Sequence, residues 1–333
     1  MDVNHEPDFD RPKWNETRWF GCWNPHEGIG IYLHMGRFRH DLDMWWAQTA
    51  AYLPDGQVIV DRSFGRRPDK EGVRTGNFDL TMTEDGWTST FDGAPELTTT
   101  EALARGPRGC AAPSVPVRWQ ITGTQAAPTW DMYGSVTETQ SYAGDTHIQK
   151  TYRTTGTLRV ADKEYRLDGV GFNDHSTGIR TWDNWFGHRF LVAVMPGWTA
   201  HAVEVHSPDG GRGKPFGVIF RDGHREEIDD FVLPPLTDPG GGPRHHELVL
   251  KTTTREPMIL KTEILHSIPV TITESNDNIN GIDWETTDTP IVLMESIARL
   301  TAPDGSVGYA FHERSACRDT LPRPTNSHPK PVV

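Results

Sequence analysis

The sequence predicts an all-β protein built from two related antiparallel halves, and three observations support this. Short runs of alternating apolar and polar residues recur along the 333 residues and are bounded by Gly, Pro and Asp. Three Pro-Asp-Gly triplets supply the residues that tight turns require. The tripeptide Trp-Phe-Gly occurs at residues 19–21 and again at residues 185–187, about half a chain apart, which indicates an internal duplication.

The expected strands follow from this alternation. Each Trp-Phe-Gly copy precedes an apolar run, and the triplets at 54–56, 208–210 and 303–305 are expected at hairpin tips. Residues 291–300 fit a helix and a strand equally well, and residues 234–246, with three consecutive glycines, are expected to form a flexible loop. The runs expected as strands are 29–35, 57–61, 117–121, 157–160, 190–195 and 201–206.

The chain length is consistent with two domains of about 150 residues each. We expect an N-terminal β domain over residues 14–158 and a C-terminal β domain over residues 159–319. Residues 1–13 and 320–333 are expected to be tails, because the last segment carries four prolines and cannot build a packed element.

Composition excludes several classes of function. The 46 acidic residues exceed the 33 basic ones, and a net charge of −13 disfavours a nucleic-acid partner. No apolar run is long enough for an integral membrane segment, and the polar start of the chain does not resemble a signal peptide. Three cysteines form no disulfide framework and show no metal-ligand spacing, so we expect a cytoplasmic protein.

The densest group of reactive side chains lies between residues 169 and 185. Asp174, His175 and Arg180 supply an acid, a base and a charge partner for proton transfer. Trp182 and Trp185 offer π faces to a bulky or cationic substrate. The alternative is structural: Asp174 and Arg180 form an ion pair and the tryptophans belong to the core.

This segment resembles the motif Gly-x-Gly-x-Arg-Asp-His-Ser-Trp-Gly-x-Arg-x-Trp of a two-domain lipocalin-like superfamily that includes carotenoid 1,2-hydratases and AttH-like proteins. Residues 27–37 and 308–314 resemble a branch of unassigned activity within it. The resemblance implies two lipocalin-like antiparallel β-barrel or sandwich domains and chemistry without a metal or redox cofactor. Asn173 and Thr177 replace the usual Arg and Trp, so carotenoid hydration itself is not implied.

Two further groups are candidates. Glu204 lies on the alternating run 201–206 and is a second candidate acid. In the first half, a polar and aromatic cluster is expected to contact substrate, although a polar loop with a buried tryptophan is an alternative. Its members are His34, Arg37, Trp45 and Trp46. A metal site built from His34, His40 and Asp43 has little support, and we predict neither a metal nor a cofactor.

These features predict a cofactor-independent lyase of hydratase or dehydratase type. It would act by acid–base catalysis on a hydrophobic terpenoid, polyketide or aromatic small molecule, in secondary metabolism or catabolism. The alternatives are a non-catalytic carrier of a hydrophobic ligand, and an isomerase or cyclase, including retro-aldol or pericyclic chemistry, in the same pocket. A hydrophobic small molecule is the expected partner, and a homodimer is left open.

Overall fold

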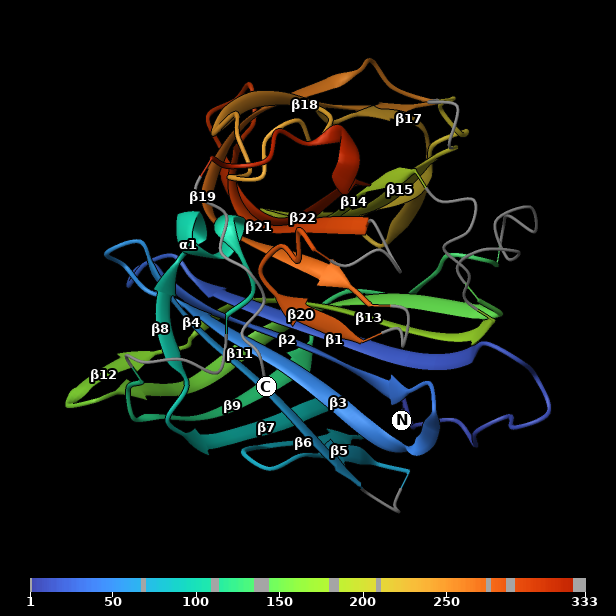
Figure 1. Ribbon diagram of the computed structural model, residues 1–333. Coiled ribbons are helices and arrows are strands. Elements are labelled where there is room, and N and C mark those ends of the chain that lie inside the picture. The colour runs from blue at the N-terminus through green and yellow to red at the C-terminus, as the bar shows by residue number, and fades with distance from the viewer. Residues whose placement is uncertain are drawn as a thin grey trace. The chain divides into compact units, whose positions relative to one another are not determined.

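Almost all regular structure in the protein is β-strand (Figure 1). The computed structural model describes residues 2–66, 70–108, 114–134, 144–179, 186–207, 211–273, 277–285 and 291–325. Within these ranges there is one α-helix, α1 (Thr100–Arg105), and one 3-10 turn, η1 (Arg318–Thr320). Neither is long and apolar enough to cross a membrane. The all-β prediction is confirmed.

The chain divides into two compact units, each built on its own sheet. The first unit comprises Met1–Thr99, Arg108–Thr181 and Thr273–Asn280. The second comprises Thr100–Pro107, Trp182–Ile272 and Gly281–Val333. Each unit therefore contains a short segment from elsewhere in the chain.

The sheet of the first unit is antiparallel and runs in the order β5-β6-β7-β9-β11-β13-β1-β2-β3-β4-β8, with β10 and β12 paired to β11. Its strands are β1 (Trp14–Asn24), β2 (Ile29–Phe38), β3 (Asp41–Tyr52), β4 (Gln57–Arg66), β5 (Gly72–Arg74), β6 (Phe78–Thr83), β7 (Gly86–Gly93), β8 (Glu96–Thr99), β9 (Val117–Gln125), β10 (Trp130–Asp131), β11 (Thr146–Val160), β12 (Lys163–Arg166) and β13 (Gly169–Ile179). The short β20 (Asn278–Asn280) contacts β3 and β4.

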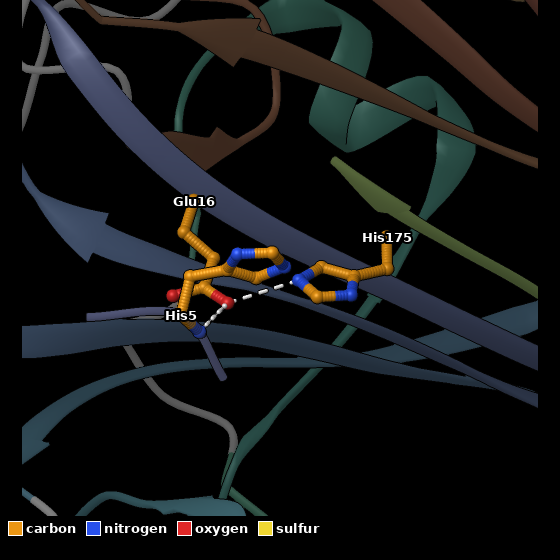
Figure 2. A group of neighbouring side chains, drawn as sticks. All are labelled: His5, Glu16 and His175. Atoms are coloured by element: carbon orange, nitrogen blue, oxygen red, sulfur yellow. Dashed lines mark hydrogen bonds and ion pairs between the residues drawn. The ribbon is translucent and has the colours of Figure 1, made fainter. Parts of the chain in front are cut away.

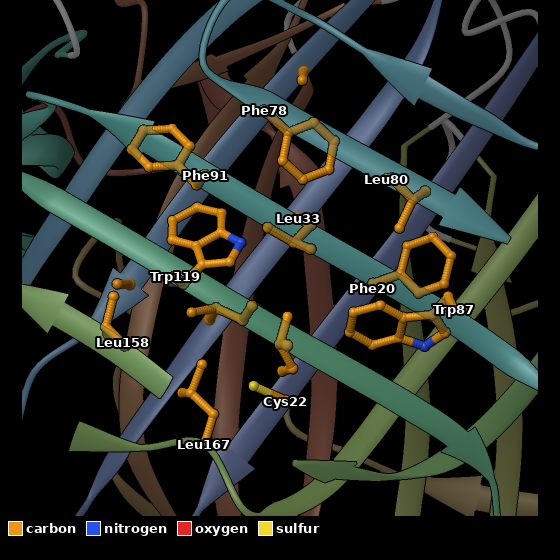
Figure 3. Close-up of a cluster of buried hydrophobic side chains, with 14 of the residues drawn as sticks. Phe20, Cys22, Leu33, Phe78, Leu80, Trp87, Phe91, Trp119, Leu158 and Leu167 are labelled. Carbon is orange, nitrogen blue, oxygen red and sulfur yellow. The ribbon is translucent and has the colours of Figure 1, made fainter. Parts of the chain in front are cut away.

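This sheet curls around an apolar core (Figure 3). Its distant members β4 and β5 approach each other, and the Ser63 hydroxyl lies 2.6 Å from that of Thr75, just beyond β5. The enclosed side chains include Phe20, Trp87 and Trp119, each at most 2% exposed. Two faces of the sheet are thereby distinguished: an inner face around this core and an outer face.

The sheet of the second unit closes on itself as an antiparallel barrel. It runs in the order β18-β17-β16-β15-β14-β22-β21-β19, and β19 also pairs with β18. Its strands are β14 (Gly187–Met195), β15 (Trp198–His206), β16 (Phe216–Arg221), β17 (His224–Val232), β18 (His245–Thr252), β19 (Met258–Ile272), β21 (Ile291–Thr301) and β22 (Val307–Cys317). A core of small and branched apolar side chains, among them Leu191, Ala200 and Leu260, fills one part of the interior.

The two units share a strand order that fits the predicted duplication. In each, the first strand pairs with the second on one side and with the last on the other: β1 with β2 and β13, and β14 with β15 and β22. Phe20 and Gly21 lie within β1, and Phe186 and Gly187 lie at the start of β14. The remaining member of the second copy, Trp185, lies outside the described residues.

The predicted strands and two of the three predicted turns are present. The runs 57–61, 117–121, 157–160 and 201–206 fall in β4, β9, β11 and β15, and the ambiguous run 291–300 is a strand, β21. The triplets 54–56 and 303–305 join β3 to β4 and β21 to β22, and their glycines take positive φ. The triplet 208–210 lies outside the described residues.

The expected domain boundary and tails differ from the structure. The strand that carries the Asp-His motif, β13, pairs with β1 and β11, so the first unit extends well beyond residue 158. The segment expected to be an N-terminal tail is tied into this unit, since the Asn4 backbone amide donates to the Lys70 carbonyl over 2.8 Å. Leu321, expected in the C-terminal tail, is only 6% exposed. Sequence alternation cannot reveal these contacts because the partners are distant along the chain.

Candidate functional site

The motif strand β13 presents its two candidate catalytic residues to opposite faces of the sheet. His175 pairs in register with Arg18 of β1, two residues before Phe20, which belongs to the core. Because side chains alternate along a strand, Arg18 and His175 point to the inner face and Asp174 to the outer face. Asp174 and His175 are therefore neighbours in sequence that do not form one acid–base pair.

His175 is held between the carboxylates of Asp2 and Glu16, and Figure 2 shows its contact with Glu16. Its Nδ1 lies 2.7 Å from Asp2 Oδ1 and its Nε2 lies 2.9 Å from Glu16 Oε1. The ring is 2% exposed and Glu16 is fully buried. Both ring nitrogens of His175 therefore lie within hydrogen-bond distance of a carboxylate oxygen, an arrangement that holds the ring firmly in place.

The carboxylates are ionised despite their burial. Burial raises the pKa of Asp2, but the hydrogen bond with His175 and the charges of Arg18, His175 and Lys150 outweigh it and lower the pKa. The same balance holds for Glu16, where burial is outweighed by the hydrogen bond with His175 and by nearby positive charge, so its pKa is also lowered.

Three cations complete this group. Arg37 Nε donates to Glu16 Oε2 over 2.9 Å, Lys150 Nζ lies 3.1 Å from Asp2 Oδ2, and Arg18 Nη2 lies 3.4 Å from Asp2 Oδ1. We call the set Asp2, Glu16, Arg18, Arg37, Lys150 and His175 the first polar layer. Every cation in it has a carboxylate partner.

A cavity of about 380 Å³ adjoins the first polar layer. Asp2, His5 and Lys150 line it on the polar side, and Ile148 and Tyr152 are among its apolar lining. The volume lies within the range of small-molecule pockets. A larger cavity of about 540 Å³ in the same unit is bordered by exposed ion pairs such as those of Arg74 with Asp79 and Arg118 with Asp92, and it adjoins no buried reactive group of the motif.

His5 is the link between cavity and layer. Its ring centroid lies 5.4 Å from that of His175, and its backbone amide donates to Glu16 Oε1 over 2.8 Å. Burial and the positive charge of His175 lower the pKa of His5 against the opposing effect of Glu16, which keeps its imidazole neutral near pH 7. His5 is therefore a base at the cavity wall.

One ligand atom each from His5, Glu16 and His175 lies within 4.8 Å of the others, a spacing that suits a metal ion. The charges around them do not. Glu16 is already bound by Arg37, and the charge of Arg18 also acts on Glu16, so a metal would meet cations that hold its ligands. The side chains of the first polar layer therefore balance one another's charges, and this arrangement does not favour a metal ion.

The predicted first-half cluster is also divided by the sheet. Arg37 and Trp45 are on the inner face, where the guanidinium carbon lies 4.8 Å from the Trp45 ring centroid. His34 and Trp46 lie on the outer face, with ring centroids 5.2 Å apart, and His34 Nδ1 is 2.7 Å from the Asn278 amide nitrogen. The structure thus places Arg37 and Trp45 on the same face of the sheet as His175, with Arg37 joined to His175 through Glu16, and places His34 and Trp46 on the other face.

Asp174 has a separate partner on the outer face, where His147 Nε2 lies 3.2 Å from its carboxylate. In the second unit, Glu204 is buried and bound by Arg189, His206 and Arg212. Burial raises the pKa of Glu204, but these partners outweigh it and lower the pKa, which favours a structural anion over a proton donor. The predicted residues Arg180, Trp182 and Trp185 lie outside the described residues.

Five members of the site were not predicted from the sequence: Asp2, His5, Glu16, Arg18 and Lys150. The signal that was available is in β1, where Glu16 and Arg18 occupy inward positions of a strand that continues with Phe20 and Cys22. Charged residues at core positions of an alternating strand indicate a buried network. No comparable signal marks Asp2 and His5.

Comparison with known proteins supports the fold. Residues 1–318 match the model of a family described as a domain of unknown function (DUF7064). No curated protein matches the chain.

Three solved structures illustrate the likeness. A putative AttH from Nitrosomonas europaea is 13% identical, with a TM-score of 0.59 over 91% of this chain and 92% of that one. CghA with Sch210972 is 14% identical, with a TM-score of 0.54 over 92% and 89%. Kievitone hydratase from Nectria haematococca is 10% identical, with a TM-score of 0.51 over 91% and 88%. At these identities the likeness establishes the fold, and it confirms the expected resemblance to AttH-like proteins.

Proposed function

We propose that this chain, which belongs to the family of the domain of unknown function DUF7064, is a lyase of hydratase or dehydratase type. Its substrate is a small molecule with an apolar body and a carbonyl group, which carries either a hydroxyl on the β-carbon or the corresponding α,β double bond, bound in the cavity of the first unit. The name of one protein with a similar fold, a kievitone hydratase, supports this class, and a second, CghA, has been solved with Sch210972.

One observation carries the proposal: a neutral histidine at a cavity wall, backed by a buried charge network. His5 lines the cavity and stands next to the His175 ring. Lys150 lines the same cavity and is held by Asp2. A base and a cation that border one small-molecule cavity are the groups that proton transfer next to a carbonyl requires.

The dehydration direction uses these groups as follows. The neutral His5 imidazole accepts a proton from the carbon beside the substrate carbonyl, and the Lys150 ammonium binds the carbonyl oxygen as it gains negative charge. His5 then returns the proton to the departing hydroxyl, and water is released. His175 acts as a positioning residue, because its two carboxylates hold the segment that carries Asp2 and the backbone of His5.

The test starts from the ligand that the protein retains. Small molecules released from the denatured native protein are identified by mass spectrometry and then returned to the enzyme in D₂O. The proposal expects a mass change of one water together with deuterium on carbon in the hydrated species. The variant His5→Gln is expected to lose at least a hundredfold in turnover while it still binds the ligand.

His224→Gln is the matched control, because His224 is an exposed histidine on β17 of the second unit. Ligand retention with no turnover in the native protein would contradict the proposal and favour a carrier. A product isomeric with the ligand, without exchange at carbon, would favour a cyclase.

A further inference from the structure

The barrel of the second unit contains a polar layer between two apolar clusters. Along the inner face of β22, Ala310 belongs to one cluster and Ala316 to the other. The two inward positions between them are His312 and Arg314, which are both fully buried. His246 of β18 faces them, and we call His246, His312 and Arg314 the second polar layer.

Arg314 is a buried cation without a carboxylate partner among the residues that the structure describes. Nη2 donates to the Gly241 carbonyl over 2.5 Å and Nη1 to the Gly242 carbonyl over 3.3 Å, while Nε has no hydrogen-bond partner there. Burial and the charge of Arg189 lower the pKa of Arg314 to about 10, against a weak opposing effect of Asp238. A guanidinium left this way in a protein interior is costly unless an anion joins it.

His312 also lacks hydrogen-bond partners among the described residues. Neither ring nitrogen has a hydrogen-bond partner within the described part of the chain. The ring lies edge-on to that of His246, with centroids 5.6 Å apart and planes at 85°. Burial and the charge of Arg314 lower the pKa of both histidines, that of His246 to about 4 although a hydrogen bond with the Pro243 backbone opposes the shift. A neutral imidazole offers one N–H donor.

The loop over this layer brings the Gly241 and Gly242 carbonyls close to the Arg314 guanidinium. Gly241 has a φ of +83°, and a Cβ there would meet the Met294 sulfur at 3.1 Å and the Ser267 hydroxyl at 3.2 Å. Only glycine therefore lets the backbone carbonyl approach Arg314 so closely. The segment expected to be a solvated glycine-rich loop is packed against the barrel at this point, since Gly241 is buried.

We propose that the second polar layer is a binding site for a singly charged carboxylate, namely that of a small organic acid. Arg314 Nε and the His312 imidazole are the donors that such an anion would satisfy, and the single uncompensated charge matches one negative charge. This site belongs to the second unit and is independent of the cavity in the first unit. A free small anion such as formate or chloride shares the chemistry, and the experiment distinguishes the two sources.

The test is calorimetric titration of the full chain, in chloride-free buffer near pH 7.5, with benzoate, decanoate, formate and chloride and with benzamide as the neutral counterpart. We expect benzoate or decanoate to bind at least tenfold more tightly than benzamide. Arg314→Met is expected to abolish that preference, and His312→Leu, which removes a donor and no charge, to weaken acid binding several-fold. Formate or chloride binding as tightly as the larger acids would assign the site to a free anion.

Arg299→Met is the matched control, because Arg299 lies on the neighbouring strand β21, is exposed, and pairs with Glu263. The proposal is overturned if acid and amide bind alike, if no anion of the series binds, or if Arg314→Met retains the preference. If Arg314→Met does not fold, Arg314→Lys decides the question, since it keeps the charge and loses the planar fork.

Discussion

The two polar layers occupy comparable places in the two units but differ in how charge is balanced. In the first unit, Arg18, Arg37, Lys150 and His175 each contact a buried carboxylate. In the second unit, Arg314 contacts only backbone carbonyls within the described residues. Apart from Asp2, which precedes β1, the members of both layers lie on inward positions of strands that continue into an apolar core.

The difference indicates two uses of a buried charge. A network in which every cation has a partner holds a segment of chain in place, here the residues that bring Asp2 and His5 to the cavity. A buried cation without a partner raises the free energy of the folded protein, and a bound anion would remove part of this cost. The first layer is therefore expected to stabilise the fold, and the second to stabilise a complex.

The largest expected effect is in the first layer. Glu16→Ala leaves Arg37 and His175 buried without one of their carboxylates, and we expect it to lower the free energy of unfolding by about 3–5 kcal/mol. Urea denaturation measures this, with Glu164→Ala at an exposed position of β12 as the control. A loss below about 1 kcal/mol would mean that the network is not a stabilising one.

The opposite sign is expected in the second layer. Arg314→Met replaces a buried charge by an apolar side chain of similar length, and in the absence of an added anion we expect the free energy of unfolding to rise by about 1–3 kcal/mol. The same denaturation experiment measures it, and a large loss of stability would show that Arg314 has a partner that compensates its charge.

The pH dependence of stability separates the layers further. Unfolded histidine binds a proton near pH 6.5, whereas folded His246 does so only near pH 4, so its contribution is complete above pH 6.5 and is lost as the pH falls towards 4. The lowered pKa of Glu16 makes its contribution persist until the pH falls below about 4.3.

Between pH 7.5 and pH 5, His246→Gln is therefore expected to remove on the order of 1 kcal/mol of acid destabilisation, after allowance for the partial exposure of the residue. His245→Gln, at the exposed neighbouring position of the same strand, is the control. If His246→Gln and the native protein lose the same stability between pH 7.5 and pH 5, His246 does not contribute to the acid sensitivity of the fold.

The smallest effect is expected outside both layers. Asp174→Asn alters a partly exposed residue on the outer face whose carboxylate contacts His147, so we expect less than about 1 kcal/mol in stability and unchanged turnover of the retained ligand. His175→Gln, one residue away on the inner face, is expected to lower both. Similar losses of turnover in the two variants would restore the Asp-His pair as a catalytic unit.

Local sequence was sufficient for the strands because alternation and turn chemistry act within a few residues. The runs in β4, β9, β11 and β15, and the triplets that end β3 and β21, are of this kind. The alternation of side chains along a strand also bears on the site, because adjacent residues such as Asp174 and His175 point to opposite faces of a strand. The reactive residues of the motif are adjacent in the sequence, but the fold places them on opposite faces of the sheet.

The sequence by itself determined that the chain is all β and that its two halves are related, and it predicted His175 and Arg37 as candidate site residues. Only the tertiary structure decided that β13 belongs to the first sheet, that Asp2 and Glu16 enclose His175, and that Arg314 is left without a carboxylate within the described residues. The physical reason is the distance along the chain over which each interaction acts. Alternation and turns depend on neighbours in the chain, whereas the state of a buried charge depends on which distant residues the sheet register brings beside it.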